Sequence, residues 1–311
     1  MSISTGVAGV GASARAEREE AIPAGASAAP FIAPALAVLC VANVLPLLWS
    51  IGVSFFHFRA DHLNAPPRFL GLANYLDVMT DPDVWEHFLN TGMMIAASVA
   101  IQFVVGGVMA FLFLRPFRAR RAALMLVLTP MLLSTVAVGT FFGLFYDPTF
   151  GIVSALVRVV TGAPFAPLGT PFGARLSLVV ADAWMWSPFV MMMLLAGLSG
   201  VPESLHEAAE IDRASSWRRF RTVVFPAIRG VLLLALLFRT IESFNMFDLI
   251  YTVTNGGPGV ATESLSTEIY DTAFVLFESG RASALGNIGV FVVIVLARLY
   301  FRAIQMRRET F

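Results

Sequence analysis

Charged and amide side chains interrupt the apolar segment between residues 231 and 251. Arg239, Glu242, Asn245 and Asp248 follow one another there at intervals of three residues. An ionised side chain at the centre of a bilayer costs about 2.5–3.5 kcal/mol on insertion scales, so these groups must face protein or water. Carboxylate and amide oxygens accept hydrogen bonds from hydroxyl groups. The pattern therefore predicts a polar face that meets a hydroxyl-rich solute.

A structural interpretation of the same residues stays open. On one helix Arg239 and Glu242 lie within a turn of each other, close enough to form an ion pair. Asp248 is expected about 9 Å beyond Glu242 along that helix. The pair would then stabilise helix packing and not contact a solute.

A second polar and aromatic group lies in the apolar segment 176–198. It contains Asp182, Trp184 and Trp186, and Pro188 follows as a candidate kink. Aromatic faces beside a carboxylate suit a solute path, whereas the tryptophans could instead form an interfacial belt. The predicted path comprises Asp182, Trp186, Arg239, Glu242, Asn245 and Asp248.

The composition indicates what positions these groups. Hydrophobic residues make up 57% of the chain, charged residues make up 14%, and the mean hydropathy is +0.76. Such values are typical of a polytopic membrane protein and exclude an ordinary soluble domain. Apolar segments of about 20 residues suffice to cross a bilayer. We therefore expect an all-α fold with six spans, at residues 31–56, 91–114, 122–146, 176–198, 231–251 and 284–301.

The basic residues predict the orientation. The chain has no Lys, and its 21 basic residues are all Arg. They concentrate at 115–121, 213–229 and 302–308, and cytoplasmic loops carry such an excess. Both termini are therefore expected in the cytoplasm, with residues 1–30 and 307–311 as tails, the first of them disordered.

The loop 202–229 is polar and rich in Arg. Ser204 and Glu207 have the spacing of a capping box and predict a helix start. The small side chains of Ala208 and Ala209 permit close approach of another surface. A second short helix is expected through the apolar residues Trp217, Phe220, Val223 and Phe225, and Pro226 marks the start of the next segment.

This loop resembles a known signature. Glu207-Ala208-Ala209, Asp212, Ala214, Phe220 and Pro226 are similar to the EAA motif of permease subunits of binding-protein-dependent ABC importers. The resemblance implies cytoplasmic coupling helices that dock on an ATPase subunit. Arg213 departs from the usual Gly, and Arg adopts the left-handed turn conformation only at a steric cost. The implied coupling residues are Glu207, Ala208, Ala209, Asp212, Arg213, Ala214 and Pro226.

A turn follows the fifth expected span. The glycines and proline of residues 254–259 specify it. Together with Phe247-Asp248, Thr262, Tyr270 and Ala273-Phe274, it resembles sugar permeases related to the maltose first-permease subunit. The resemblance implies that this outer loop helps to dock a solute-binding protein through Asn255, Gly256, Gly257 and Pro258.

The resemblance implies a permease subunit of an ATP-driven importer for a carbohydrate or polyol, in the bacterial cytoplasmic (inner) membrane. Residues 31–306 would form its transmembrane domain. Its partners would be membrane lipid, a second homologous permease, an ATP-binding subunit dimer and an extracytoplasmic solute-binding protein. ATP and Mg would bind to the ATPase subunits, and no cofactor to this chain. A permease for glycerol phosphate would need cationic path residues, and Arg239 is the deep candidate.

The sequence argues against other classes. Without Lys the chain cannot supply the lysine of a phosphate-binding Walker loop, and no catalytic set can be assembled. A metal site formed by His57, Asp61 and His62 is the weaker alternative to exposed loop histidines. A net charge of +0 does not support nucleic-acid binding. A free-standing secondary transporter remains the competitor from another class, and the intact EAA loop argues against it.

Overall fold

The computed structural model describes residues 29–62, 66–163 and 165–305. It is helical, apart from an antiparallel pair of two-residue strands, β1 (Phe56–His57) and β2 (Arg68–Phe69). Within the described residues, those before Ser50 and those from Ser50 onward form separate compact units. The expected tails lie outside the described residues, except that helix α2 already begins at Ala29.

The N-terminal segment is one apolar helical stretch. It consists of α2 (Ala29–Leu39), a π-helical turn (Cys40–Val44) and α3 (Leu45–Val53). Residues Ile32–Val53 are long and apolar enough to cross a membrane. Its side chains are apolar apart from Asn43 and Ser50, so this helix suits contact with lipid or with other membrane helices.

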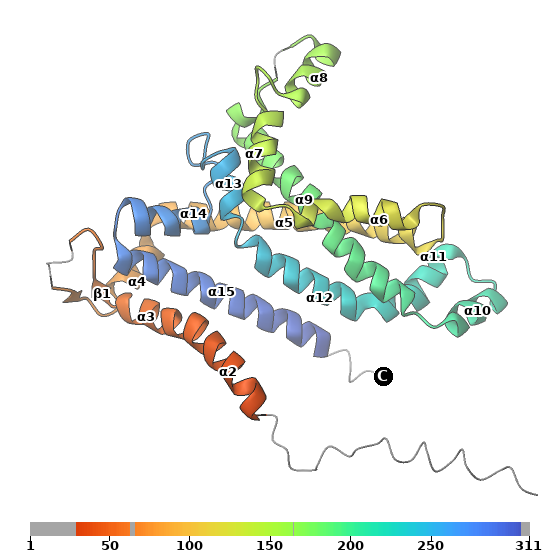
Figure 1. Cartoon of the computed structure of the whole chain (residues 1–311), viewed down its shortest axis with the longest axis horizontal. Helices are drawn as coiled ribbons and strands as arrows, with labels where there is room; N and C mark the ends of the chain where they lie inside the picture. Colours follow the sequence, from red (N-terminus) through yellow and green to blue (C-terminus); the bar gives the residue numbers. More distant parts are fainter. Residues whose placement is uncertain (1–28, 63–65, 164, 306–311) are drawn as a thin grey trace, which may run out of the picture. The chain divides into compact units, whose positions relative to one another are not determined.

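Four further long helices complete a set of five that could each cross a membrane. They are α5 (Pro82–Leu114), α9 (Pro171–Ser199), the stretch Ser216–Ser243 and α15 (Ser279–Gln305) (Figure 1). Local sequence defines their starts. The Asp81 side chain accepts a hydrogen bond from the Asp83 amide (3.0 Å) at the start of α5, and Thr170 caps α9 in the same way through the Gly173 amide.

The helices α5 and α9 pack closely because α5 has a glycine at their contact. A Cβ on Gly106 would lie 2.7 Å from the Ser187 carbonyl oxygen and 2.9 Å from the Met191 amide nitrogen. The backbones therefore approach where no side chain intervenes. A buried apolar cluster next to this contact includes Ala110, Val190 and Met191.

The third expected span, residues 122–146, is bent. The helix from Arg120 to Leu132, which comprises α6 (Arg120–Leu128) and a 3-10 turn (Thr129–Leu132), meets α7 (Thr135–Phe145) at 95°. Pro130 lies in the 3-10 turn, and Leu133 is extended. If the bent pair counts as one span, the described residues contain six candidate spans, which is the number predicted.

The fifth expected span, residues 231–251, ends early. A continuous helix runs through α11 (Ser216–Arg219), a π-helical turn (Phe220–Val224) and α12 (Phe225–Ser243). Its 28 residues extend about 42 Å, which already exceeds the hydrocarbon thickness. Residues 244–246 then form a turn, and α13 (Phe247–Val253) is a separate helix.

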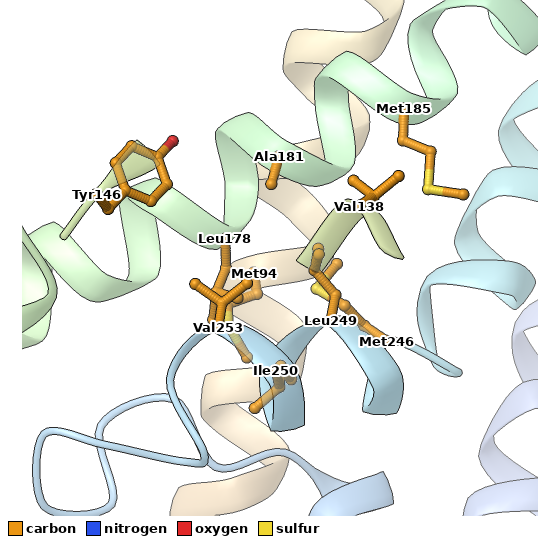
Figure 2. Packing of buried hydrophobic residues seen from close by; sticks show 10 residues of the cluster. All are labelled: Met94, Val138, Tyr146, Leu178, Ala181, Met185, Met246, Leu249, Ile250 and Val253. Carbon is orange, nitrogen blue, oxygen red and sulfur yellow. The ribbon is translucent and has the colours of Figure 1, made fainter. Parts of the chain in front are cut away.

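The helices α7, α9 and α13 share a core with α5. Figure 2 shows Met94, Val138, Leu178 and Leu249 packed together with their neighbours in this cluster. The remaining elements are α4 (Ala73–Thr80), α8 (Ile152–Thr161), a 3-10 turn (Pro167–Gly169), α10 (Glu203–Ile211), α14 (Leu265–Tyr270) and a π-helical turn (Asp271–Val275).

Candidate functional site

A buried polar cluster joins three long helices around Arg239. The Arg239 side chain on α12 donates from Nε to Gln102 Oε1 of α5 at 2.8 Å. Its Nη2 lies 3.4 Å from Asp182 Oδ1 of α9 and donates to Ser243 Oγ at 3.1 Å. Gln102 in turn donates to Asp182 Oδ2 at 2.7 Å. Of the two interpretations left open, the structural ion pair is therefore observed, but Arg239 forms it with Asp182 and not with Glu242.

An aromatic ring covers this cluster. The Trp186 ring centroid lies 4.7 Å from Cζ of Arg239, within the range of a cation–π contact. Trp186 follows Asp182 by four residues, so one face of α9 presents both groups to Arg239. Arg239 is 1% exposed, and its Nη1 has no hydrogen-bond partner among the described residues.

The other predicted path residues lie apart from the cluster. Glu242 is exposed in the last turn of α12, and Asn245 is exposed in the turn after that helix. Asp248 is exposed on α13, so it does not continue the face of α12 as predicted. Because the helix breaks at residues 244–246, a spacing of three residues no longer places these groups on one face.

The sequence reasoning missed Gln102. It is fully buried on α5 and bonds both members of the ion pair. An amide in the middle of a long apolar segment was the available signal, since a buried amide needs hydrogen-bond partners.

The loop 202–229 forms two helices, as expected, but begins differently. Helix α10 starts at Glu203 after Pro202, and no described side chain caps it, so the predicted capping box of Ser204 and Glu207 is absent. The first hydrogen bond of this helix runs from the Leu205 amide to the Pro202 carbonyl. Pro202 supplies the start through its fixed φ, in place of a side-chain cap.

The turn between the two helices is left-handed at Arg213. Its φ is 49°, the Ala214 amide bonds the Ala209 carbonyl, and the Arg213 amide bonds the Glu210 carbonyl, both at 3.0 Å. These two bonds define a Schellman motif. Arg213 thus adopts the conformation for which the family motif uses Gly, despite the steric cost of its Cβ.

The second helix of the loop is capped and tied to the first. Ser215 Oγ accepts from the Arg218 amide at 3.3 Å, and Arg219 forms an ion pair with Glu210 at 3.1 Å. Of the motif residues, Ala209 is buried, whereas Ala214 and Pro226 are half-buried. Pro226 lies near the start of α12, inside the continuous helix from Ser216. The exposed motif residues are Glu207, Ala208, Asp212 and Arg213.

The turn after α13 is held by one buried threonine. Thr262 donates from Oγ1 to the Gly257 carbonyl at 2.9 Å and from its amide to the Gly256 carbonyl at 3.0 Å. Asn255 and Gly256 have φ values of 47° and 83°, and the bond between Gly257 and Pro258 is cis. Asn255 is exposed, whereas Gly256 is buried against Glu263.

The histidines His57 and His62 are exposed as expected, whereas His87 is buried. Asp61 is exposed as well. Arg59 bonds Asp61 (Nη2–Oδ2 3.0 Å) and lowers the pKa of that carboxyl. Among the described residues, the group whose ligand atoms lie close enough to share a metal ion is His87, Glu263 and Glu268.

Long apolar helices with a buried polar cluster between them are features of a polytopic membrane protein. The sequence matches the family described as "Binding-protein-dependent transport system inner membrane component" over residues 102–309, and the chain belongs to this family. It is therefore a multi-pass permease subunit of an ABC importer and not an enzyme.

Relatives and solved structures agree with this membership. The chain is 32% identical to the trehalose/maltose transport system permease protein MalF of Thermococcus litoralis, over 89% of this chain and 93% of that protein. It is 32% identical to the trehalose transport system permease protein SugA of Mycobacterium tuberculosis H37Rv, over 87% and 86%. A chain of a bacterial ABC transporter that imports alginate shares the fold, with a TM-score of 0.76 at 18% identity over 89% and 94% of the two chains.

Proposed function

We propose that this chain forms part of the translocation path for a carbohydrate delivered by a solute-binding protein. The observation that carries the proposal is the cluster of Arg239, Asp182, Gln102 and Trp186 between three long helices. It combines hydrogen-bonding groups with an aromatic face, which suits a polyhydroxylated solute. The relatives are named for trehalose, maltose and lactose transport.

The proposed path would have a structural part formed by Asp182, Trp186 and Arg239, because these side chains contact one another. Glu242, Asn245 and Asp248 would contact the solute, because their side chains remain exposed in the isolated chain. The Nη1 of Arg239 has no partner among the described residues and is buried, so it offers a donor to an internal water.

An anionic solute such as glycerol phosphate is less well supported. It would need an available cation deep in the path, and the Arg239 guanidinium already faces the Asp182 carboxylate. The charge of Arg239 is thus compensated within the protein.

The partners are proposed from the same features. The exposed face of α10 would dock on an ATP-binding subunit dimer, which binds ATP and Mg, and Glu207 to Ala214 would transmit its motion. A second homologous permease would complete the path. The turn at Asn255 to Pro258 would meet the solute-binding protein on the outer side of a bacterial cytoplasmic membrane. A crystal structure of the alginate transporter includes a periplasmic protein bound to an alginate pentasaccharide.

Uptake by cells that express the complete transporter tests the proposal. Labelled trehalose, maltose and lactose are each offered with an excess of unlabelled sugar or of glycerol phosphate. We expect uptake of at least one sugar, with competition by sugars and not by glycerol phosphate. Competition by glycerol phosphate and not by sugars would show that the transported solute is an anion and not a neutral carbohydrate.

A further inference from the structure

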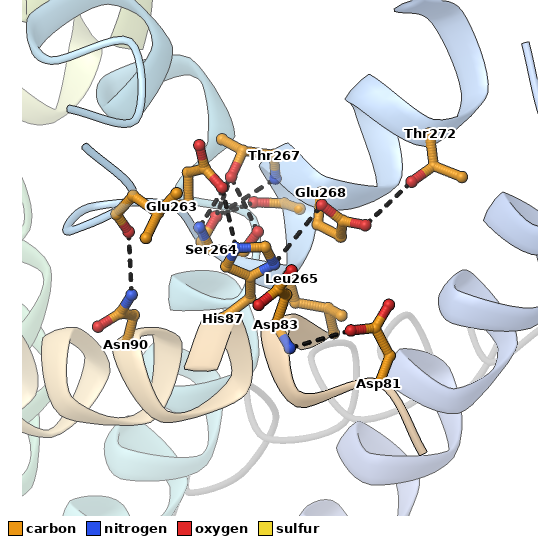
Figure 3. Close-up of polar contacts among 12 residues, drawn as sticks. Asp81, Asp83, His87, Asn90, Glu263, Ser264, Leu265, Thr267, Glu268 and Thr272 are labelled. Carbon is orange, nitrogen blue, oxygen red and sulfur yellow. Dashed lines mark hydrogen bonds and ion pairs between the residues drawn. The ribbon is translucent and has the colours of Figure 1, made fainter. Parts of the chain in front are cut away.

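The buried imidazole of His87 has one nitrogen with a partner and one without. Its Nε2 lies 2.9 Å from Glu263 Oε2, which is hydrogen-bonding distance (Figure 3). Its Nδ1 is buried and has no hydrogen-bond partner among the described residues. Because an ionised carboxylate only accepts, the contact with Glu263 assigns the ring proton to Nε2. The Nδ1 of His87 then presents a lone pair inside the protein, as in the neutral histidines that bind metal ions.

A second carboxylate lies beside this lone pair. Glu268 Oε2 of α14 is 3.5 Å from His87 Nδ1, which is longer than an ordinary hydrogen bond. Two ligands of one tetrahedral zinc ion, each about 2.0–2.2 Å from the metal, are about 3.4 Å apart. The other oxygen of Glu268, Oε1, accepts from Thr272 Oγ1 at 3.1 Å and lies 3.6 Å from Arg281 Nη1. The separation of Nδ1 and Oε2 therefore suits two ligands of one ion better than a hydrogen bond.

Negative charge exceeds positive charge around these atoms. The guanidinium of Arg281 on α15 is shared among three carboxylates, those of Asp77, Asp81 and Glu268. Glu263 adds a fourth carboxylate, and the neutral ring of His87 adds no positive charge. Four carboxylates and one guanidinium leave an excess of three negative charges, of which a divalent cation would offset two.

We propose that His87 Nδ1 and Glu268 Oε2 bind one divalent transition-metal ion of the Zn²⁺ type, and that water completes its coordination. Imidazole nitrogen and carboxylate oxygen are zinc ligands, whereas Mg²⁺ and Ca²⁺ prefer sites made of oxygen alone. Glu263 acts on the ring and not on the ion, since a metal-bound histidine commonly donates its second N–H to a carboxylate. One ligand atom from each of the three residues lies within 4.8 Å of the other two, so the site is already gathered.

The ion joins two elements that are distant in the sequence. His87 lies near the start of α5, and Glu268 lies on α14, beyond the turn at residues 254–259. A hydrogen bond from the Leu265 amide to Thr91 Oγ1, at 2.9 Å, already links the same two helices. The metal would strengthen this attachment. Its binding does not depend on the docking role proposed for the turn.

Zinc binding to the purified, assembled transporter tests the site. The complex carries an affinity tag without histidine, is stripped with a chelator and is then equilibrated with Zn²⁺ in excess Mg²⁺. Elemental analysis counts the bound zinc, and competition with a chromophoric chelator measures its affinity. Zinc on the partner subunits is the same in every variant, so the difference between variants reports this chain.

Substitutions assign the ligands. His87→Gln and Glu268→Gln should each remove one zinc ion per copy of this chain, and either variant suffices if the other does not accumulate. Glu263→Gln should keep the ion but weaken its binding by about 10- to 100-fold, because the ring loses its charged acceptor. His62→Gln is the matched control, since His62 is exposed with its Nε2 3.6 Å from Asp61, and it should bind zinc like the parent.

Three results would overturn the proposal. The first is a parent complex that binds no more zinc than the His87→Gln or Glu268→Gln complex. The second is loss of the ion in His62→Gln and its retention in His87→Gln, which would assign the metal to the exposed group of His57, Asp61 and His62. The third is displacement of the zinc by Mg²⁺, which would exclude a site that selects through imidazole.

Discussion

The guanidinium of Arg239 on α12 pairs with the carboxylate of Asp182 on α9, with Nη2 and Oδ1 3.4 Å apart. Both side chains are almost fully buried. Removing one member of a buried pair leaves an uncompensated charge, which typically costs about 3–5 kcal/mol. This pair therefore fixes the relation of the two helices that flank the proposed path.

Arg239→Ala and Asp182→Ala are each expected to reduce assembly of the transporter. The exchange Arg239→Asp with Asp182→Arg should restore part of it, because both charges regain a partner. Glu242→Ala is the control, since Glu242 is exposed. Size-exclusion chromatography of the detergent-extracted complex measures the outcome. If the exchanged variant assembled no better than either single variant, the exact geometry of the two side chains, and not only their opposite charges, would be needed to hold the helices together.

The exposed residues of the proposed path should affect transport and not assembly. Asn245→Ala and Glu242→Ala are expected to reduce uptake of the carried sugar, each lost hydrogen bond being worth about 0.5–1.5 kcal/mol. Basal ATPase activity and assembly should stay at the parent level. Full uptake by both variants would exclude Asn245 and Glu242 from the solute route.

The left-handed turn at Arg213 predicts a gain in stability on substitution. Arg213→Gly removes the Cβ at a φ of 49° and should stabilise the two-helix loop by about 1 kcal/mol. Arg213→Val should destabilise it, because a β-branched side chain tolerates this conformation poorly. Thermal unfolding of the assembled complex, compared across the three proteins, measures the order. If Arg213→Gly unfolded at a lower temperature than the parent, the Arg213 side chain would make a contact that stabilises the loop by more than the backbone strain costs.

The sequence predicted the features that depend on local composition. Apolar length located the helices, and the motif located the turn at Arg213, whose left-handed conformation only the structure shows. It could not locate the breaks at Leu133 and at residues 244–246, because an apolar segment continues through each and only packing decides where the helix stops.

The side-chain contacts between different helices could not be predicted from the sequence either. Arg239 and Glu242 share a helix turn, but Asp182 and Gln102 come from other helices that meet Arg239 only in the folded chain. His87 likewise contacts Glu263 and Glu268, which are far from it in the sequence and meet it only in the folded chain.

We propose that this permease couples carbohydrate transport to ATP hydrolysis through loop 202–229. Glu207 is exposed on α10 at the surface proposed to meet the ATPase, and Glu203 is exposed on the same helix outside the motif. ATPase activity stimulated by the sugar-loaded binding protein is measured in proteoliposomes with Glu207→Arg and with Glu203→Arg. We predict that Glu207→Arg abolishes stimulation and uptake while the subunit remains in the membrane, and that Glu203→Arg retains both. Normal stimulation and uptake with Glu207→Arg would contradict coupling through this loop.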